Sequence, residues 1–170
     1  FIENSGGKGV AWLSADLWSI NFHHKKGTPM DNIEVREALN LAINRKELID
    51  GLLNGVPEIP SQPAPRNAYG FNDKLDPIKY DPERAKALLA DAGFPNGFSF
   101  VLEGAIGVGA NDSAMYQKVA QDLSMIGVKM KIQPIPVSQL IRNVIEGGWE
   151  GDAFGLNYTS LPTLDVLKSM

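Results

Sequence analysis

Apolar residues recur at helical spacing in the stretch Lys79–Phe100, and the flanking residues mark both ends of a helix. Asp81 can accept hydrogen bonds from the free amides of a helix start, and Pro82 suits the first helical position. Gly93 fits the left-handed position that follows a helix, and Pro95 prevents the helix from continuing. The apolar face consists of Ala85, Leu88, Leu89 and Ala92. Because the stretch carries no group poised for reaction, we interpret it as scaffold.

Strand-like and helix-like patterns alternate through the rest of the second half of the chain. Apolar residues at every second position indicate strands, and apolar residues at helical spacing indicate helices. The predicted elements are strands at 98–103, 128–133 and 152–158 and helices at 113–126 and 138–146. We expect Asn111 or Asp112 to cap the first of these helices and Ser138 to cap the second. Strands that alternate with helices pair in parallel, so the pattern predicts an α/β fold.

The first half contains two predicted helices between a strand and a long irregular segment. A strand is expected at 10–22, and a helix is expected at 33–45 from its apolar spacing. A short second helix is expected to begin at Asn44. Residues 55–77 are rich in proline and turn-forming residues and lack periodicity. A loop of this length is often functional, and we interpret it as an ordered surface loop.

Ligands of open α/β sheets bind beyond the carboxyl ends of the strands. Three predicted loops share that edge, at 104–112, 134–138 and 157–162. Tyr158 stands at the start of the third loop, where an aromatic ring offers a flat apolar face to a ligand. The sequence therefore predicts a binding site at this edge of the sheet.

Composition narrows the function classes. The length of 170 residues fits one domain or two small ones, and the net charge of −4 argues against nucleic-acid binding, which requires a basic surface. No apolar run is long enough to span a membrane. The absence of cysteine excludes disulfides and thiolate metal sites. The chain does not begin with Met and opens on no secretion signal, so we interpret it as a piece of a longer protein, with any signal or anchor in the remainder.

Two enzyme-like patterns are weak. The glycine-rich loop at 104–109 lies between a strand and a helix, but its spacing is GxxGxG rather than the dinucleotide-binding GxGxxG. It supports an alternative function, that of an α/β nucleotide- or sugar-handling enzyme domain. His23 and His24 are adjacent, so in an extended segment they point in opposite directions and do not share one metal ion. No nucleophile elbow of the form GxSxG accompanies them, and we expect neither a catalytic set nor a metal or cofactor.

Three stretches together resemble a known family. They are "INF…PMDNIEVREALNLAINRKELIDGLLNGVPEIPSQPAP", "YDPERAKALLADAGFPNGFSFVL" and "VAQDLSMIGVKMKIQPI". In this order they closely resemble the family 5 extracellular solute-binding proteins of ABC importers, which take up dipeptides, oligopeptides, nickel complexes and some sugars or opines. The matching residues include Asn21, Pro29, Val35, Arg36, Ala38, Arg45, Gly55, Tyr80, Asp81, Pro82, Lys86, Leu89, Gly93, Gly97, Leu123, Ile126 and Gly127. The likeness covers about residues 10–165.

The resemblance implies that residues 1–170 form a single α/β lobe of a two-lobed receptor, with the mixed, mainly parallel sheet of the type II periplasmic-binding-protein fold. It implies capture of a small solute between two lobes that close around it by hinge motion, delivery to ABC transporter permease subunits, and no catalysis. It also implies an extracytoplasmic monomer, in the periplasm or as a cell-surface lipoprotein, that is associated with the membrane only through the permease or an anchor.

Positions of the family's ligand-facing loops fall on five residues of this chain: Asn111, Gly155, Leu156, Asn157 and Thr159. With Tyr158, which is predicted from its place at the sheet edge, they make six candidate ligand-binding residues. The family segment after the last strand looks like "GW.aDY..P", whereas this chain has "GLNYTSLP". Leu156 therefore replaces the tryptophan, and Thr159 replaces the acid that pairs with a peptide's α-amino group. A hydroxyl and an amide suit a sugar or another polyhydroxylated solute better than a buried ammonium group, which needs a charged partner.

Overall fold

The computed structural model describes residues 16–159 except 24, 65, 67, 68 and 110. In chain order the elements are β1 (Asp16–Phe22), the 3-10 turn η2 (Pro29–Asp31), α1 (Ile33–Leu41), α2 (Arg45–Leu52), α3 (Pro82–Asp91), β2 (Ser99–Ala105), α4 (Asp112–Ser124), β3 (Lys129–Ile135), α5 (Val137–Glu146) and β4 (Ala153–Thr159). The expected first part of the initial strand, at 10–15, and the end of the third predicted loop, at 160–162, lie outside the described residues.

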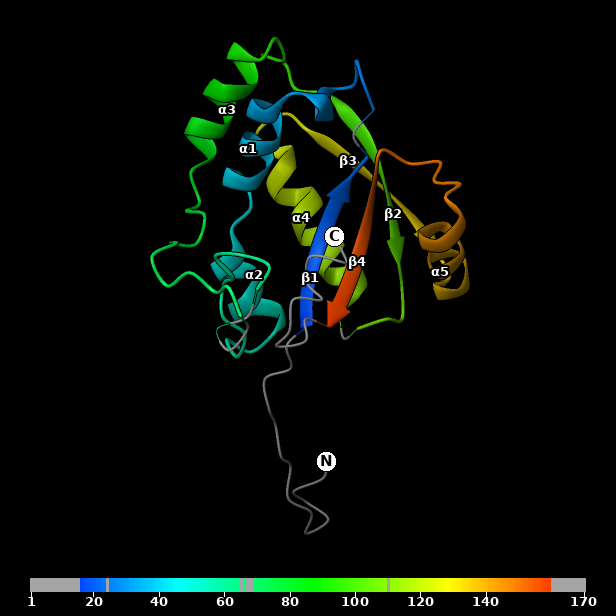
Figure 1. Ribbon diagram of the computed structural model, residues 1–170. Coiled ribbons are helices and arrows are strands. Elements are labelled where there is room, and N and C mark those ends of the chain that lie inside the picture. The colour runs from blue at the N-terminus through cyan, green and yellow to red at the C-terminus, as the bar shows by residue number, and fades with distance from the viewer. Residues whose placement is uncertain (1–15, 24, 65, 67–68, 110, 160–170) are drawn as a thin grey trace.

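The four strands form one sheet in the order β1-β4-β2-β3 (Figure 1). β2 pairs in parallel with both β3 and β4, whereas β1 runs antiparallel to β4 at one side of the sheet. The alternation of strands and helices in the sequence produces this parallel pairing. The predicted α/β class with a mixed, mainly parallel sheet is thus confirmed.

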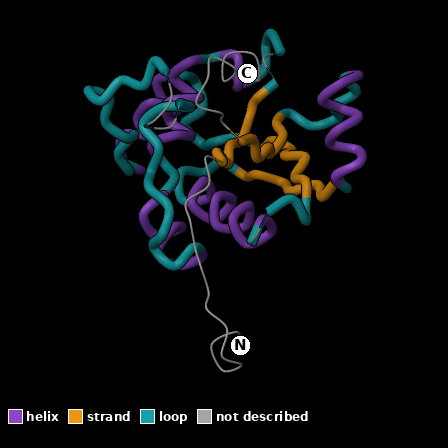
Figure 2. Tube along the Cα trace, turned by 60° about the horizontal axis from the view of Figure 1, so that its bottom comes forward, coloured by secondary structure: helices purple, strands orange, loops and turns teal. Residues whose placement is uncertain are grey.

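Helices cover the two faces of the sheet unequally (Figures 1 and 2). The main core, which includes Phe100, Leu102 and Val119, lies between one face and the helices α1, α2 and α4, and α3 packs against the outside of α1. The other face carries α5, whose Leu140 packs in a smaller cluster with Ala105. Among the described residues, no helix is both long and apolar enough to cross a membrane.

Side-chain caps fix the starts of three helices. The side-chain oxygens of Asn32, Asn44 and Asp81 accept backbone N–H bonds at the starts of α1, α2 and α3, at distances of 2.8, 3.2 and 2.9 Å. Each satisfies an amide that the helix itself cannot pair. The predicted roles of Asn44 and Asp81 are confirmed. Gly93 has a φ of +90° after α3, which a side chain would strain.

The predictions of helix caps at Asn111 or Asp112 and at Ser138 are wrong. Neither Asn111 nor Asp112 caps α4 with its side chain, because Asn111 bonds back to α2 and Asp112 bonds to the preceding loop. α5 begins directly after Pro136, so Ser138 lies inside the first helical turn rather than before it. Proline fixes the backbone conformation at this start, and no side-chain cap is formed.

Candidate functional site

The carboxyl ends of β2, β3 and β4 lie at one edge of the sheet because these strands are parallel (Figure 1). The loop that follows β2 approaches the end of β4 closely there. A Cβ atom added at Gly109 would lie 3.0 Å from Asp112 Oδ1 and 3.7 Å from Asn157 Nδ2. The predicted meeting of the first and third loops is confirmed as far as Thr159, where the described part of the third loop ends.

Asp112 organises the glycine-rich loop from within. Its buried carboxylate accepts hydrogen bonds from the backbone N–H groups of Val108 and Gly109, at 3.0 and 2.8 Å. A bound phosphate would need such loop amides as donors, and its charge would be repelled by the carboxylate. The geometry therefore disfavours the alternative function of a nucleotide-handling enzyme.

Asn111 ties the same loop to α2. It has a left-handed backbone with a φ of +64°, which asparagine tolerates better than most residues. Its Nδ2 donates a hydrogen bond to the carbonyl oxygen of Leu52 at 2.8 Å. Asn111 thus holds the loop at the sheet edge, next to the end of α2.

Tyr116 of α4 packs against β2 and β4 close to this loop. Its hydroxyl donates to the carbonyl oxygen of Ala105 at 3.4 Å, and its ring lies 5.1 Å from that of Trp18. Gly155 faces this ring so closely that an added Cβ atom would lie 2.6 Å from two ring carbons. Burial, and next the Asp112 carboxylate, raises the pKa of Tyr116 to about 12.

The raised pKa of Tyr116 predicts a loss of stability in alkali. The folded protein keeps a phenol proton that the unfolded chain loses at its ordinary pKa of about 10. Its contribution to the free energy of unfolding is therefore full below pH ~10 and is lost as the pH rises through about 12. Urea unfolding measured between pH 10 and 12 should show that the free energy of unfolding falls less steeply with pH for Tyr116→Phe than for the wild type. Equal slopes for the two proteins would contradict the assignment.

An apolar cleft runs from this edge along β1. It has a volume of about 710 Å³, within the range of small-molecule sites. Trp18, Ile20 and Phe22 line its sheet wall, the loop at 57–63 lies opposite, and Asn157 lies at the carboxyl edge. Asn157 Oδ1 is buried and has no hydrogen-bond partner. An unpaired buried acceptor is costly, which makes this oxygen a candidate contact for a donor of a ligand.

The six candidate ligand residues do not all lie together. Asn157 lines the cleft, Asn111 is bonded to α2 at the same edge, and Gly155 is buried under Tyr116. Leu156 lies on the opposite face, in the cluster with Leu140, because successive strand residues alternate. For Tyr158 and Thr159 the structure describes the backbone, which pairs with Leu17 and Asp16 of β1. The sequence marked the segment at 55–77 as a long surface loop of a kind that is often functional, but its lack of periodicity did not indicate that residues 57–63 line a cleft.

A separate aromatic cluster lies on the α5 face. The rings of Trp149 and Phe154 stack at 4.2 Å, and the ring of His23 lies 5.4 and 5.2 Å from them. Burial, and next the charge of Lys25, lowers the pKa of His23. The adjacent residue, His24, lies outside the described residues. His23 thus has a packing role on the face away from the cleft.

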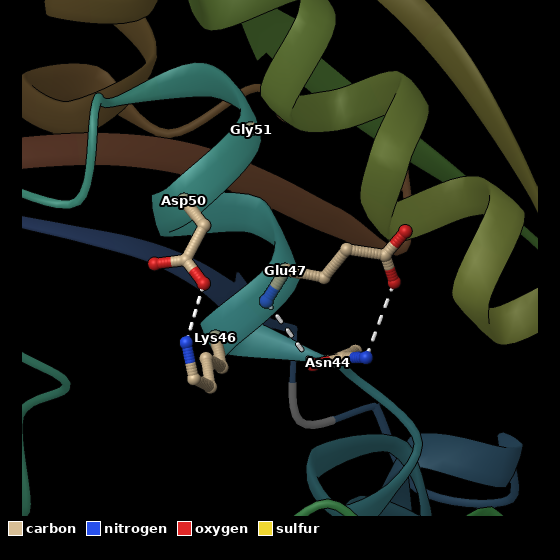
Figure 3. A pocket seen from close by; sticks show the side chains of 5 residues that line it. All are labelled: Asn44, Lys46, Glu47, Asp50 and Gly51. Atoms are coloured by element: carbon tan, nitrogen blue, oxygen red, sulfur yellow. Dashed lines mark hydrogen bonds and ion pairs between the residues drawn. The ribbon is translucent and has the colours of Figure 1, made fainter.

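A shallow polar hollow at the start of α2 is internally paired (Figure 3). Lys46 forms an ion pair with Asp50, and Asn44 Nδ2 donates to Glu47 Oε2 at 3.1 Å. Glu47 also pairs with Lys118, which is bonded to the buried Asp122. These contacts join α2 to α4 and leave the hollow little unused hydrogen-bonding capacity.

Comparison with known proteins agrees with this geometry. Residues 6–164 match the sequence model of the bacterial extracellular solute-binding proteins, family 5 middle. Heme-binding protein A of Haemophilus influenzae is 34% identical over 143 residues, covering 78% of this chain and 26% of that protein. The dipeptide-binding protein of Escherichia coli is 32% identical over 151 residues, covering 82% of this chain and 28% of that protein.

The fold is shared with a solved relative. The structure of HbpA2 from Haemophilus parasuis matches with a TM-score of 0.79 and 28% identity, over 90% of this chain and 30% of that one. The chain therefore spans about a third or less of the length of these relatives. On the family match over residues 6–164, this chain belongs to the bacterial extracellular solute-binding proteins of family 5.

Proposed function

We propose that this chain forms one lobe of a solute-binding receptor that serves an ABC importer. The receptor captures a small solute between two lobes and delivers it to the permease subunits. It acts outside the cytoplasm as a monomer and catalyses no reaction. Family membership supports this role, since the related proteins are described as heme-binding and dipeptide-binding.

The observation that carries the proposal is the unpaired Oδ1 of Asn157 in the wall of the cleft. A mostly apolar cleft with a few well-placed polar groups is the usual form of a small-molecule site. The ligand site that we propose comprises Asn111, Gly155, Asn157, Tyr158 and Thr159, and Leu156 packs behind it on the opposite face of the sheet. In it Asn157 accepts a hydrogen bond from the ligand, and Asn111 and Gly155 shape the edge of the cleft.

Binding by the isolated chain should be weaker than binding by the full-length gene product. A closed two-lobed site buries most of its ligand, whereas one lobe supplies only part of the contacts. Thermal-shift screening of the full-length product with dipeptides, glutathione, heme, sugars and opines would identify a ligand. Calorimetry with that ligand would then compare the two proteins.

The two results have different meanings. Tighter binding by the full-length product would support the two-lobed receptor. Equal affinities would show that this chain carries a complete site, and the proposal of a single lobe would then be wrong. The absence of binding by any solute of the panel would count against the transport role itself.

A further inference from the structure

Arg45 places a positive charge in the wall of the cleft along β1. It is the first residue of α2 and is partly buried. Its Nη1 donates a hydrogen bond to the carbonyl oxygen of Asn40 at 2.9 Å, and its Nη2 donates to Asn40 Oδ1 at 2.8 Å. A guanidinium has more N–H donors than these two bonds use, so further donors of Arg45 remain for another acceptor.

The acidic residues of the cleft wall do not neutralise this charge. Glu58 forms an ion pair with Arg66, and the Asp112 carboxylate accepts hydrogen bonds from two loop amides. Arg45 takes part in none of the ion pairs that the described residues form with one another. Arg45 is therefore a cation of the cleft that no carboxylate in the described part of the chain compensates.

Burial makes this charge a strong partner for an anion. It lowers the pKa of Arg45, because it takes water away from the guanidinium. An arginine nevertheless keeps its proton at neutral pH, so the positive charge stays in the cleft. The planar fork of a guanidinium can donate two parallel hydrogen bonds to a carboxylate or a phosphate.

The carboxylate of the glycine-rich loop lies toward the other end of α2. Asn111, the neighbour of Asp112 in sequence, bonds to the carbonyl oxygen of Leu52, which is the last residue of the helix. A helix of eight residues is about 12 Å long. Because Coulomb energies fall with distance, Asp112 repels an anion at Arg45 less than the contacting guanidinium attracts it.

We propose that Arg45 binds an acidic group of the solute, a carboxylate or a phosphate, inside the cleft. The inference rests on the proposed function, since it names the chemical class of the solute that the receptor captures. The two bonds to Asn40 hold the guanidinium in place before the solute arrives, which reduces the cost of ordering it. Asn157 Oδ1 then accepts a hydrogen bond from a donor elsewhere on the same solute.

Matched pairs of solutes test this preference on the full-length gene product. Each pair has an acidic member and a neutral member: acetyl-alanyl-alanine and its carboxamide, galacturonate and galactose, and glycerol phosphate and glycerol. In calorimetry at least one acidic member should bind roughly 30-fold or more tightly than its neutral partner. If the neutral members bind as tightly as the acidic ones, the inference is wrong and the receptor role stands. If no solute of these pairs or of the thermal-shift panel binds, both are contradicted.

The variant Arg45→Gln separates recognition from a structural role. It should weaken binding of the acidic member by roughly 30-fold or more and leave binding of the neutral member nearly unchanged. Arg45→Lys keeps the charge but loses the fork, so it should retain part of the preference for the acid. If Arg45→Gln does not fold, Arg45→Lys and the wild-type comparison decide the question.

Arg84→Gln is the matched control for the loss of one positive charge. Arg84 is exposed on α3, pairs with Glu37 and does not line the cleft. This variant should keep the full preference for the acidic member. A purely structural Arg45 would give the opposite pattern, in which Arg45→Gln weakens both members of a pair by the same factor or weakens neither, and that result would overturn the proposal.

Discussion

Replacing Gly155 by alanine is expected to lower the free energy of unfolding by about 3 kcal/mol. The added methyl group would overlap the buried ring of Tyr116, with two ring carbons at 2.6 Å. The ring cannot move aside, because it is 2% exposed, is part of the main core and lies against Trp18. Chemical denaturation of the wild type and the variant would measure the effect.

The matched control is Gly51→Ala in α2. No atom lies within 4 Å of an added Cβ at Gly51, so this change should stabilise the helix by about 0.5–1 kcal/mol. The double variant Gly155→Ala with Tyr116→Leu should be more stable than the sum of the two single effects predicts, since the smaller side chain relieves the overlap. Strict additivity, or a neutral Gly155→Ala, would contradict the contact between Gly155 and Tyr116.

The second large effect concerns the ligand, which we expect to bind without an ion pair between its α-amino group and this chain. The two acidic residues that line the cleft, Asp112 and Glu58, do not supply such a partner. Asp112 is already committed to two loop amides, and Glu58, which also lines the cleft, is paired with Arg66. Asp152 precedes β4 and accepts a bond from Val101 N at 2.9 Å, so it lies at the opposite end of that strand from Thr159.

A buried ammonium that loses its charged partner costs about 2–5 kcal/mol, which is a loss of roughly 30-fold or more in affinity. Acetylating the amino group of a bound peptide should therefore weaken its binding to the full-length product by less than roughly 30-fold. Calorimetry with free and acetylated dipeptides makes the comparison. The expectation is wrong if free peptides bind at micromolar concentration or better, acetylation abolishes their binding, and both Thr159→Ala and Asn157→Ala are without effect.

Local signals in the sequence account for most of the architecture. Three local patterns correctly predict where elements begin or end. Asp81–Pro82 marks the start of α3, Gly93 marks its end, and the two-residue alternation after Phe98 marks strand β2. Parallel pairing then follows from the alternation of strands and helices. It also places the predicted loops at one edge without any knowledge of side-chain contacts.

The site itself could be predicted only in outline. Asp112 has the residue type of a cap, and only the three-dimensional path of the loop shows that its carboxylate bonds to Val108 and Gly109 instead. Leu156 and Asn157 are neighbours in sequence, yet strand alternation places them on opposite faces. The loop at 57–63 has no periodicity, so its position opposite β1 depends on tertiary packing alone.

The central claim is that the cleft along β1 contributes to solute capture through Asn157. The most direct measurement is titration calorimetry of the full-length gene product and its Asn157→Ala variant with the solute that gives the largest thermal shift. Loss of one hydrogen bond to a buried acceptor, at about 1–1.5 kcal/mol, should weaken binding by roughly tenfold. Gln121→Ala, which removes an exposed amide from α4, should bind like the wild type. Unchanged affinity of a folded Asn157→Ala variant would contradict the claim.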